Sequence, residues 1–207
     1  MEQSKQYEYV DLGLPSGLKW AKCNVGAEKE TDYGDYFQWG ETEPHDVDTP
    51  YDWANYKYSD DSYNTLTKYN YTTSYGEDPD GKTTLELEDD AARANMGGNW
   101  RMPRPSEFRE LLVYPINEWV EDFNGSGVSG RKFTSKTDES KYIFIPASGY
   151  RFGSSLYFQG GGGGIWSSSL YTAVPYSACF LSFSSDNFNA DNNIGRFHGF
   201  VVRGVMD

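Results

Sequence analysis

The chain has 207 residues, which suits one domain and is long enough to bury a hydrophobic core. Aromatic residues make up 17% of it, a content that excludes disorder over most of its length. Its 31 acidic and 18 basic residues give a net charge of -13. A surface that negative repels phosphate backbones and anionic lipids, so nucleic acid is not expected as a partner.

The sequence contains no apolar run approaching the roughly 18 residues that span a bilayer, so direct membrane insertion is not expected. The N-terminal sequence MEQSKQYEYVD has no hydrophobic segment for export. Residues 1–6 are predicted to form a disordered tail. This N-terminus is compatible with a cytoplasmic protein, a phage virion component or a piece of a longer secreted parent.

The first half of the chain is predicted to hold short strands and long loops. Residues 7–75 scatter aromatics among Gly, Asp and Pro with no sustained helical period. Two helices are predicted next: residues 87–96, which begin with acids and end at two glycines, and residues 106–112. In the second, Phe108, Leu111 and Leu112 are predicted to share one apolar face.

The last third has a strand-type sequence. The expected strands lie within four segments, KYIFIPASGYR, GIWSS, ACFLSFSS and GFVVRGV. The glycine run at residues 160–164 and the Asn/Asp-rich residues 184–195 are predicted to be loops. Because no repeat or linker composition divides the chain, we expect a single α+β domain over residues 1–207, with two helices, a small antiparallel sheet and long irregular loops.

Residue types that carry catalysis are scarce. The only histidines are His45 and His198, and no G-x-S-x-G motif is present, so a catalytic triad is not expected. Cys23 and Cys179 lack a zinc-ligand spacing and form no disulfide framework, although one bridge between them stays open. The G-x-G-x-x-G match at residues 125–130 leads into RKFTSK, which is too polar and short for a nucleotide-binding helix. No enzymatic activity is predicted, and a hydrolase that uses two carboxylates stays as an open alternative.

Acidic clusters offer weak metal candidates. Oxygen-rich loops of this kind can hold calcium. The candidate ligands are Asp78, Asp80, Glu86 and Asp89. No EF-hand pattern is present, and acids before a helix are explained by their favourable interaction with its dipole. We therefore expect no cofactor, with calcium as the alternative.

The strongest signal in the sequence is an absence. From Ser167 to Val205 there is no Lys, Glu, Gln, Met or Trp, although these types supply about 37 of the first 166 residues. The odds of this by chance are on the order of one in ten thousand. The fifteen types that do occur are those encoded by codons ending in a pyrimidine. Randomising the first two bases of codons such as AAC yields this set. Strand preference is the alternative explanation, and it accounts for missing Lys and Glu better than for missing Trp and Gln.

Several motifs in order carry a resemblance to a known family. They are VDLGLPSGLKWAKCNVGA, DYGDYFQWGE, LEDDAA, NWRMPRPSEFRELL, IFIPASGYR, IWSS and GFVVRGV. This series resembles a large paralogous family of gut bacteria and their phages, which is similar to the C-type lectin fold in the branch shared with formylglycine-generating enzymes. Members with such an ending resemble the variable proteins of diversity-generating retroelements, in which a reverse transcriptase copies a template with errors at adenines. Gly204 and Arg104 depart from the usual Pro and small polar residue.

The resemblance implies a variable region at residues 166–205. Positions that match its invariant framework are Trp166, Ser167, Ser168, Arg196, Gly199, Phe200, Val202 and Arg203. Candidates for ligand-binding, hypervariable positions are Leu170, Tyr171, Val174, Tyr176, Cys179, Phe180, Ser182, Asn193, Ile194, Phe197 and His198. Strand alternation requires that either Cys179 or Phe180 face inward. The copper and paired-cysteine chemistry of the formylglycine-generating branch has no matching cysteine motif here.

These observations predict a receptor- or adhesin-type binding protein whose C-terminal surface is diversified to recognise an exposed protein or glycan on a cell surface. Mixed aromatic and small polar residues are typical of such binding surfaces. The expected location is a cell surface, the extracellular space or a phage virion. The alternative is a carbohydrate-binding module or surface adhesin of the same fold with fixed specificity.

Overall fold

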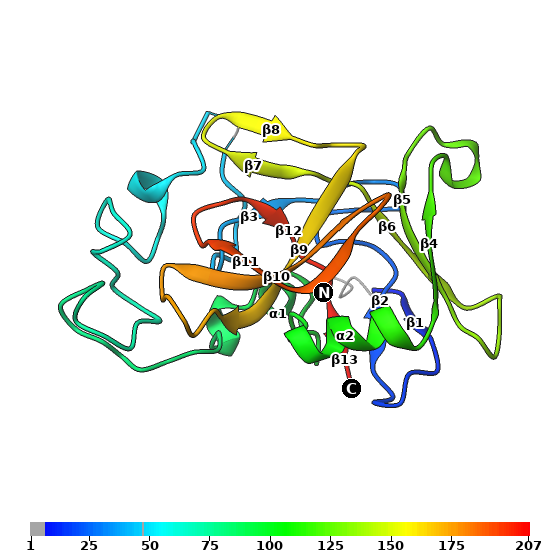
Figure 1. Cartoon of the computed structure of the whole chain (residues 1–207), viewed down its shortest axis with the longest axis horizontal. Coiled ribbons are helices and arrows are strands. Elements are labelled where there is room, and N and C mark those ends of the chain that lie inside the picture. Colours follow the sequence, from blue (N-terminus) through cyan, green and yellow to red (C-terminus); the bar gives the residue numbers. More distant parts are fainter. Residues whose placement is uncertain (1–6, 47) are drawn as a thin grey trace, which may run out of the picture.

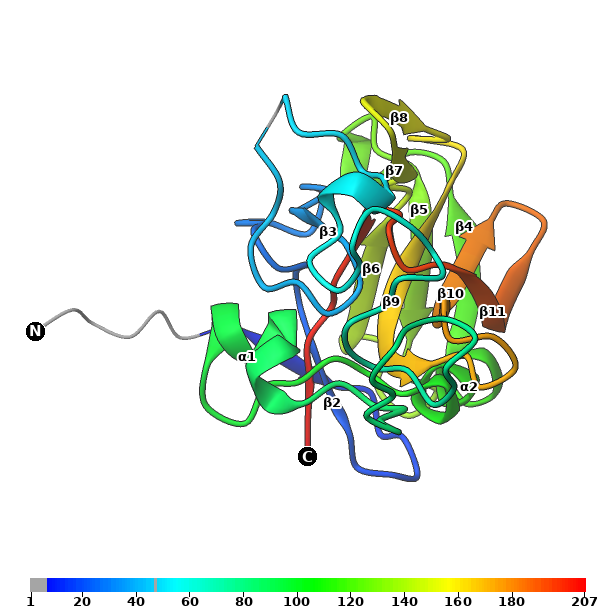
Figure 2. The same ribbon diagram turned by 90° about the vertical axis from the view of Figure 1, so that its left-hand side faces the viewer.

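A computed structural model describes residues 7–46 and 48–207 (Figures 1 and 2). The tail predicted over residues 1–6 lies outside the described residues. In the part that is described, two α-helices accompany several small, mostly antiparallel sheets, as expected for an α+β chain. No helix among these residues is long and apolar enough to cross a membrane.

The two predicted helices form close to their expected places. Leu87–Asp89 is a 3-10 turn, and α1 (Ala91–Met96) follows it, with the Asp90 side chain capping its first turn and Gly97 ending it in the left-handed region. Helix α2 (Pro105–Val113) begins with proline, whose fixed φ suits a first helical position. It buries Phe108 and Leu111, but Leu112 is exposed, so the predicted apolar face is narrower than expected.

The central sheet has five strands in the order β11-β10-β9-β12-β3. The bounds are β3 (Tyr36–Phe37), β9 (Gly162–Leu170), β10 (Ser177–Ser184), β11 (Phe188–Gly195) and β12 (Phe200–Val201). The pairing of β12 with β9 is parallel and the other pairings are antiparallel, so the sheet is mixed. Two predictions were wrong here: the Asn/Asp-rich segment forms β11, and three glycines of the glycine run belong to β9.

Three smaller sheets surround the central one. They are β1-β2-β13, β4-β5-β6 and the hairpin β7-β8. Their bounds are β1 (Tyr9–Asp11), β2 (Lys19–Ala21), β4 (Ile116–Val120), β5 (Gly130–Thr134), β6 (Tyr142–Pro146), β7 (Tyr150–Phe152), β8 (Ser155–Tyr157) and β13 (Val205–Met206). Further 3-10 turns are Trp53–Asn55 and Phe123–Gly125. The G-x-G-x-x-G match therefore leads into a strand.

The central sheet is buried on both faces. One face, which carries Trp166 and Phe180, packs against aromatic side chains of the irregular loops between β3 and α1, among them Trp39. The other face, which carries Ile165 and Leu181, packs against the sheet β4-β5-β6 and α2. In Figure 1 the loops coloured cyan to green lie to the left of β9, and the strands β5 and β6 lie to its right. This double burial is the main source of hydrophobic stabilisation for the tail.

Two arginines of the tail are fully buried and tie it to the rest of the chain. Arg196 donates to the carbonyl oxygens of Lys68 and Tyr69, and its guanidinium lies 5.4 Å from the ring centroid of Trp39. Arg203 donates four hydrogen bonds of 2.6–2.9 Å, to Oδ1 of Asn24 and to the carbonyl oxygens of Ala21, Lys22 and Phe144. Every guanidinium nitrogen of Arg203 replaces its lost hydration with a fixed acceptor, whereas Nε of Arg196 has no hydrogen-bond partner among the described residues.

A buried ion pair makes stability depend on pH. Nε2 of His45 lies 2.9 Å from Oε2 of Glu41, and the two side chains are 10% and 9% exposed. The hydrogen bond to Glu41 raises the pKa of His45 in the folded state. Its stabilisation is then complete below the unfolded pKa of about 6.5 and is lost as pH rises through the folded pKa. We expect urea unfolding of the wild type to show this loss as the pH rises above about 6.5, and His45→Gln to show a smaller change. An equal change in both proteins would contradict the role of this ion pair.

Candidate functional site

All framework positions of the tail are buried. The set comprises Trp166, Ser167, Ser168, Arg196, Gly199, Phe200, Val202 and Arg203. Their polar groups bond within the chain: the indole of Trp166 donates to the carbonyl oxygen of Phe37, and Oγ of Ser167 donates to that of Cys179. Because burial and internal hydrogen bonds restrict what can replace them, these side chains are suited to holding shape.

Most candidate binding positions are half-buried. They are Tyr171, Val174, Tyr176, Cys179, Ser182, Asn193, Ile194, Phe197 and His198. Two assignments need correction, because Leu170 and Phe180 are buried in the core beside Trp166. Of the alternating pair, Phe180 faces inward and Cys179 is partly accessible, so Cys179 is the one that stays a candidate. Leu170 contributes packing, and Phe180 both packs in the core and lines a cavity described below.

The half-buried candidates come from three places in the tail. Residues 171–176 form the turn between β9 and β10, the middle group lies on β10 and β11, and residues 197–198 form the turn before β12 (Figure 1). We call this set the tail surface. It occupies two faces of the sheet, because the paired Cys179 and Asn193 alternate with the paired Ala178 and Ile194 and therefore point to the α2 side. Its two ends carry aromatic rings, Tyr176 at the first turn and Phe197 at the second. The strands between them give it a rigid backbone, since β10 is hydrogen-bonded on both sides.

Aromatic residues outside the tail extend both ends of the tail surface. The ring of Tyr176 lies 5.6 Å from that of Tyr63 and 5.5 Å from that of Tyr75, in edge-on geometry. The ring of Phe197 lies 5.8 Å from that of Phe152, and 4.9 Å from that of Trp53. Sequence reasoning confined to the tail missed these residues. The dense Tyr content of the early loops and the aromatics of YRFGSSLYF were the available signals.

The β7-β8 hairpin contributes an aromatic cluster with large exposed rings. Phe152 and Tyr157 are exposed, and Phe158, which follows β8, is 71% exposed. Tyr150 lies in the middle, stacked with Tyr157 at 5.6 Å, with Phe158 at 6.0 Å and with the framework residue Phe200 at 5.4 Å. Clustered exposed rings of this kind mark binding surfaces on otherwise polar proteins.

A cavity of about 250 Å³ lies where the hairpin cluster meets the tail. Its lining combines fixed residues of the hairpin and glycine run with tail residues, namely Gly149, Tyr150, Phe158, Gly161, Gly162, Gly163, Phe180, Ser182, Phe183, Ser184, Ile194 and Phe200. None of the lining residues is charged. The arrangement suits recognition of an uncharged group, and the lining holds no carboxylate, imidazole, amine or thiol beside its hydroxyls.

Burial favours the neutral forms of two side chains of the tail surface, His198 and Cys179. Burial lowers the pKa of His198, which favours the uncharged imidazole. Burial likewise raises the pKa of the Cys179 thiol above its ordinary value, which favours the protonated form. Arg109 of α2 and Asp191 of β11, which are joined by a salt bridge at the edge of the sheet, are the charged groups that act on Cys179. The tail surface is therefore mainly apolar and neutral on a strongly acidic protein.

The acidic residues considered for calcium do not gather as one set. Asp80 accepts from the backbone N–H groups of Tyr69, Asn70 and Lys82. Among the described residues, Glu86, Glu88 and Asp89 do lie close enough to share an ion. Nζ of Lys68 lies 2.7, 3.4 and 2.5 Å from these three carboxylates. The chain's own ammonium group thus stands where a cation would bind, and a metal would have to displace it.

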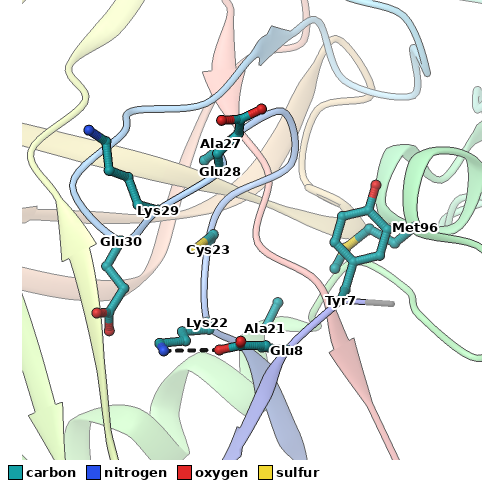
Figure 3. A pocket seen from close by; sticks show the side chains of 10 residues that line it. All are labelled: Tyr7, Glu8, Ala21, Lys22, Cys23, Ala27, Glu28, Lys29, Glu30 and Met96. Atoms are coloured by element: carbon teal, nitrogen blue, oxygen red, sulfur yellow. Dashed lines mark hydrogen bonds and ion pairs between the residues drawn. The ribbon is translucent and has the colours of Figure 1, made fainter. Parts of the chain in front are cut away.

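Another cavity, of about 400 Å³, surrounds Cys23 (Figure 3). No histidine or second cysteine is among its lining residues, and an ion pair joins Lys22 to Glu8 within it. Burial raises the pKa of the Cys23 thiol, which opposes the thiolate form that nucleophilic catalysis requires. Both cysteines are free, so the possible bridge between Cys23 and Cys179 is absent. Neither cavity contains a recognisable catalytic arrangement.

No protein-family model, curated protein or solved structure matches the chain. Any functional assignment therefore depends on the residue pattern of the tail and on the geometry described above.

Proposed function

We propose that the chain is a ligand-binding protein of receptor or adhesin type whose tail surface is diversified by retroelement-directed adenine mutagenesis. Its targets are exposed proteins or glycans on a cell surface, and the protein itself acts at a cell surface, in the extracellular space or on a phage virion. The fold proposed for it is C-type-lectin-like. Binding uses aromatic anchors and loop hydrogen bonds, with no catalytic step and no cofactor.

One observation carries this proposal. The tail separates into buried positions that match the invariant framework and partly accessible positions that are free to differ. Such a separation is what a diversified surface requires, because substitutions at accessible positions cost little stability while those in a packed core cost much. The restricted set of fifteen residue types between Ser167 and Val205 agrees with randomisation at the first two codon bases.

The fold assignment is supported by the element pattern and the motif order. Two helices, long irregular loops and a central sheet completed by the C-terminal third agree with the resemblance to the C-type lectin fold. Lys68 inside the acidic cluster disfavours a sugar site bridged by calcium at that place. A fixed-specificity carbohydrate module of this fold is the competing outcome of the experiments below.

The binding role is tested by exchanging accessible tail residues together. The variant Tyr171→Asn, Val174→Ser, Tyr176→Asn and Asn193→Tyr should change the binding pattern of labelled protein on a glycan array and on intact bacteria of several species. Its free energy of unfolding should fall by about 1–3 kcal/mol, because Tyr176 loses two edge-on ring contacts worth about 0.5–1.5 kcal/mol each, and urea unfolding checks that the variant stays folded. The matched control Leu87→Asn with Ile116→Asn alters exposed apolar residues outside the tail surface and should keep the original pattern.

Diversification is tested on the surrounding DNA. We expect a near-copy of the segment that encodes residues 166–205, different only where the copy has adenine, with a reverse transcriptase gene beside it. A binding pattern unchanged by the tail exchange would reject the binding role. Changed binding without such a copy would leave an adhesin with fixed specificity.

A further inference from the structure

We propose that the cavity of about 250 Å³ between the β7-β8 hairpin and β10, here called the ring pocket, receives a single aromatic side chain from a protein target. This inference depends on the proposed binding function and goes beyond it by naming the class of group that is bound. It also adds a fixed subsite to a surface that otherwise varies.

The ring pocket has the size and walls that an aromatic ring requires. The rings of Tyr150, Phe158 and Phe200 stand on its fixed side, and Phe180 and Ile194 belong to its tail side. Its volume of about 250 Å³ exceeds the roughly 150 Å³ of an engineered apolar cavity that binds benzene. Aromatic rings bind such walls through offset-stacked and edge-to-face contacts.

The chemistry of the lining separates an aromatic side chain from a sugar. The only polar side chains among the lining residues are Tyr150, Ser182 and Ser184. Oγ of Ser182 already accepts a hydrogen bond of 3.0 Å from Nδ2 of Asn192. A sugar presents several hydroxyl groups that would be left without partners here, and each unpaired buried hydroxyl opposes binding. An apolar ring has no such requirement.

Phe158, at the rim of the ring pocket, has a backbone conformation that costs free energy. Its φ is 59°, in the left-handed region that residues other than glycine rarely adopt. Its carbonyl oxygen accepts 3.0 Å hydrogen bonds from the N–H groups of Gly161 and Gly162, and these fix the turn. The outcome is a ring that is 71% exposed beside the pocket instead of buried in the core. Strain that keeps an apolar ring in solvent is typical of a binding site.

Charge and continuity indicate the kind of partner. The ring pocket carries no charge, whereas the whole chain has a net charge of -13. A target loop with basic residues around its aromatic side chain would be attracted to this surface, because opposite potentials favour encounter. Ser182 and Ile194 belong both to the pocket and to the tail surface. One target loop can therefore insert its ring into the fixed pocket while its neighbours contact variable residues.

The first test uses p-cresol, the analogue of a tyrosine side chain, titrated into the ¹⁵N-labelled full chain and followed by NMR. We expect saturable shifts in residues that line the pocket and none with methyl α-D-mannoside. Gly161→Leu should reduce the affinity for p-cresol at least tenfold, because Gly161 lines the pocket and a leucine side chain there competes with the ligand for space. A Cβ at this position meets only the Phe158 carbonyl oxygen, at 3.7 Å, so the substitution causes no clash with the fold. Ser185→Leu, at the exposed tip between β10 and β11, should leave the affinity unchanged.

A second variant separates binding from folding. Phe158→Asn removes the ring and suits the left-handed backbone better, so the midpoint of urea unfolding should stay equal or rise while the affinity for p-cresol falls at least fivefold. A fall in the midpoint with unchanged affinity would make Phe158 a packing residue and overturn its proposed role. Saturable binding of the mannoside, or p-cresol shifts that Gly161→Leu does not reduce, would overturn the ring pocket.

The two proposals fail in distinguishable ways. If p-cresol does not bind but the tail exchange changes the targets recognised, the ring pocket is rejected and the binding function stands. If p-cresol binds in the pocket but the tail exchange changes nothing, the fixed subsite stands and the variable surface is rejected. Concentration-dependent dimerisation that Gly161→Leu abolishes would assign the pocket to a second copy of the chain and overturn the proposed partner.

Discussion

Replacing Arg203 by leucine is expected to lower the free energy of unfolding by about 3–5 kcal/mol. The guanidinium is fully buried and donates to four acceptors on two separate segments of the chain, residues 21–24 and Phe144. Leucine would leave these acceptors without a partner in a place that water does not reach, and the loss of each buried hydrogen bond costs about 1–3 kcal/mol. Burial lowers the pKa of Arg203 to about 10, which still leaves it charged at neutral pH.

Urea unfolding at pH 7 measures this effect, with a check that the dependence on denaturant concentration is unchanged. Arg104→Leu is the matched control. Arg104 is exposed and its side chain forms no ion pair within the described part of the chain, so its loss should change stability by about 0.5 kcal/mol or less. A loss of unfolding free energy below about 1 kcal/mol in Arg203→Leu would mean that the four carbonyl and amide acceptors find water or other donors. Arg203 would then not act as a framework residue.

Phe180→Asn is expected to destabilise the fold by about 3–5 kcal/mol, whereas Cys179→Asn should cost about 1 kcal/mol or less. The ring of Phe180 lies 4.7 Å from that of Phe200 and 5.9 Å from that of Trp166, inside the core. Asparagine there would leave a cavity and bury an amide group. Cys179 is half-buried, and its thiol makes one weak contact of 3.7 Å with the carbonyl oxygen of Leu170.

The test is the difference between the losses of unfolding free energy that Phe180→Asn and Cys179→Asn cause. Thermal or urea unfolding of both variants measures it. If the two substitutions cost the same, the separation of the tail into packed and accessible positions would be wrong. The pair also bears on how far diversification can extend, because position 180 then accepts only side chains that fill the core.

The helices could be predicted because their signals are local. Acids and paired glycines bound α1, and the spacing of Phe108 and Leu111 marks the buried side of α2. Strand β11 could not be predicted, because its sequence FNADNNIG shows no apolar alternation. It forms at the edge of the sheet, where pairing to β10 uses backbone groups and requires only Ala190 to be buried. Strand formation there depends on a partner that no local pattern reveals.

The candidate site was only partly accessible to sequence reasoning. The tail stood out by composition, but alternation does not separate core from surface in β9 and β10, because both faces of that sheet are covered. Leu170 was misassigned for this reason. The hairpin cluster around Tyr150 lies outside the compositional signal, and only the fold brings it next to the tail. Long-range proximity of this kind has no signature in a single sequence.

The burial of all the framework residues has a consequence for the gene. Every residue type in that set can be written in codons without adenine: TGG for Trp, TCC for Ser, CGC for Arg, GGC for Gly, TTC for Phe and GTC for Val. An enzyme that errs only at template adenines would then pass over the packed positions without any selection for stability. Under the proposed function, Arg196 and Arg203 should be encoded by CGN codons and not by AGA or AGG. The genetic code itself would keep the fold intact in each new variant.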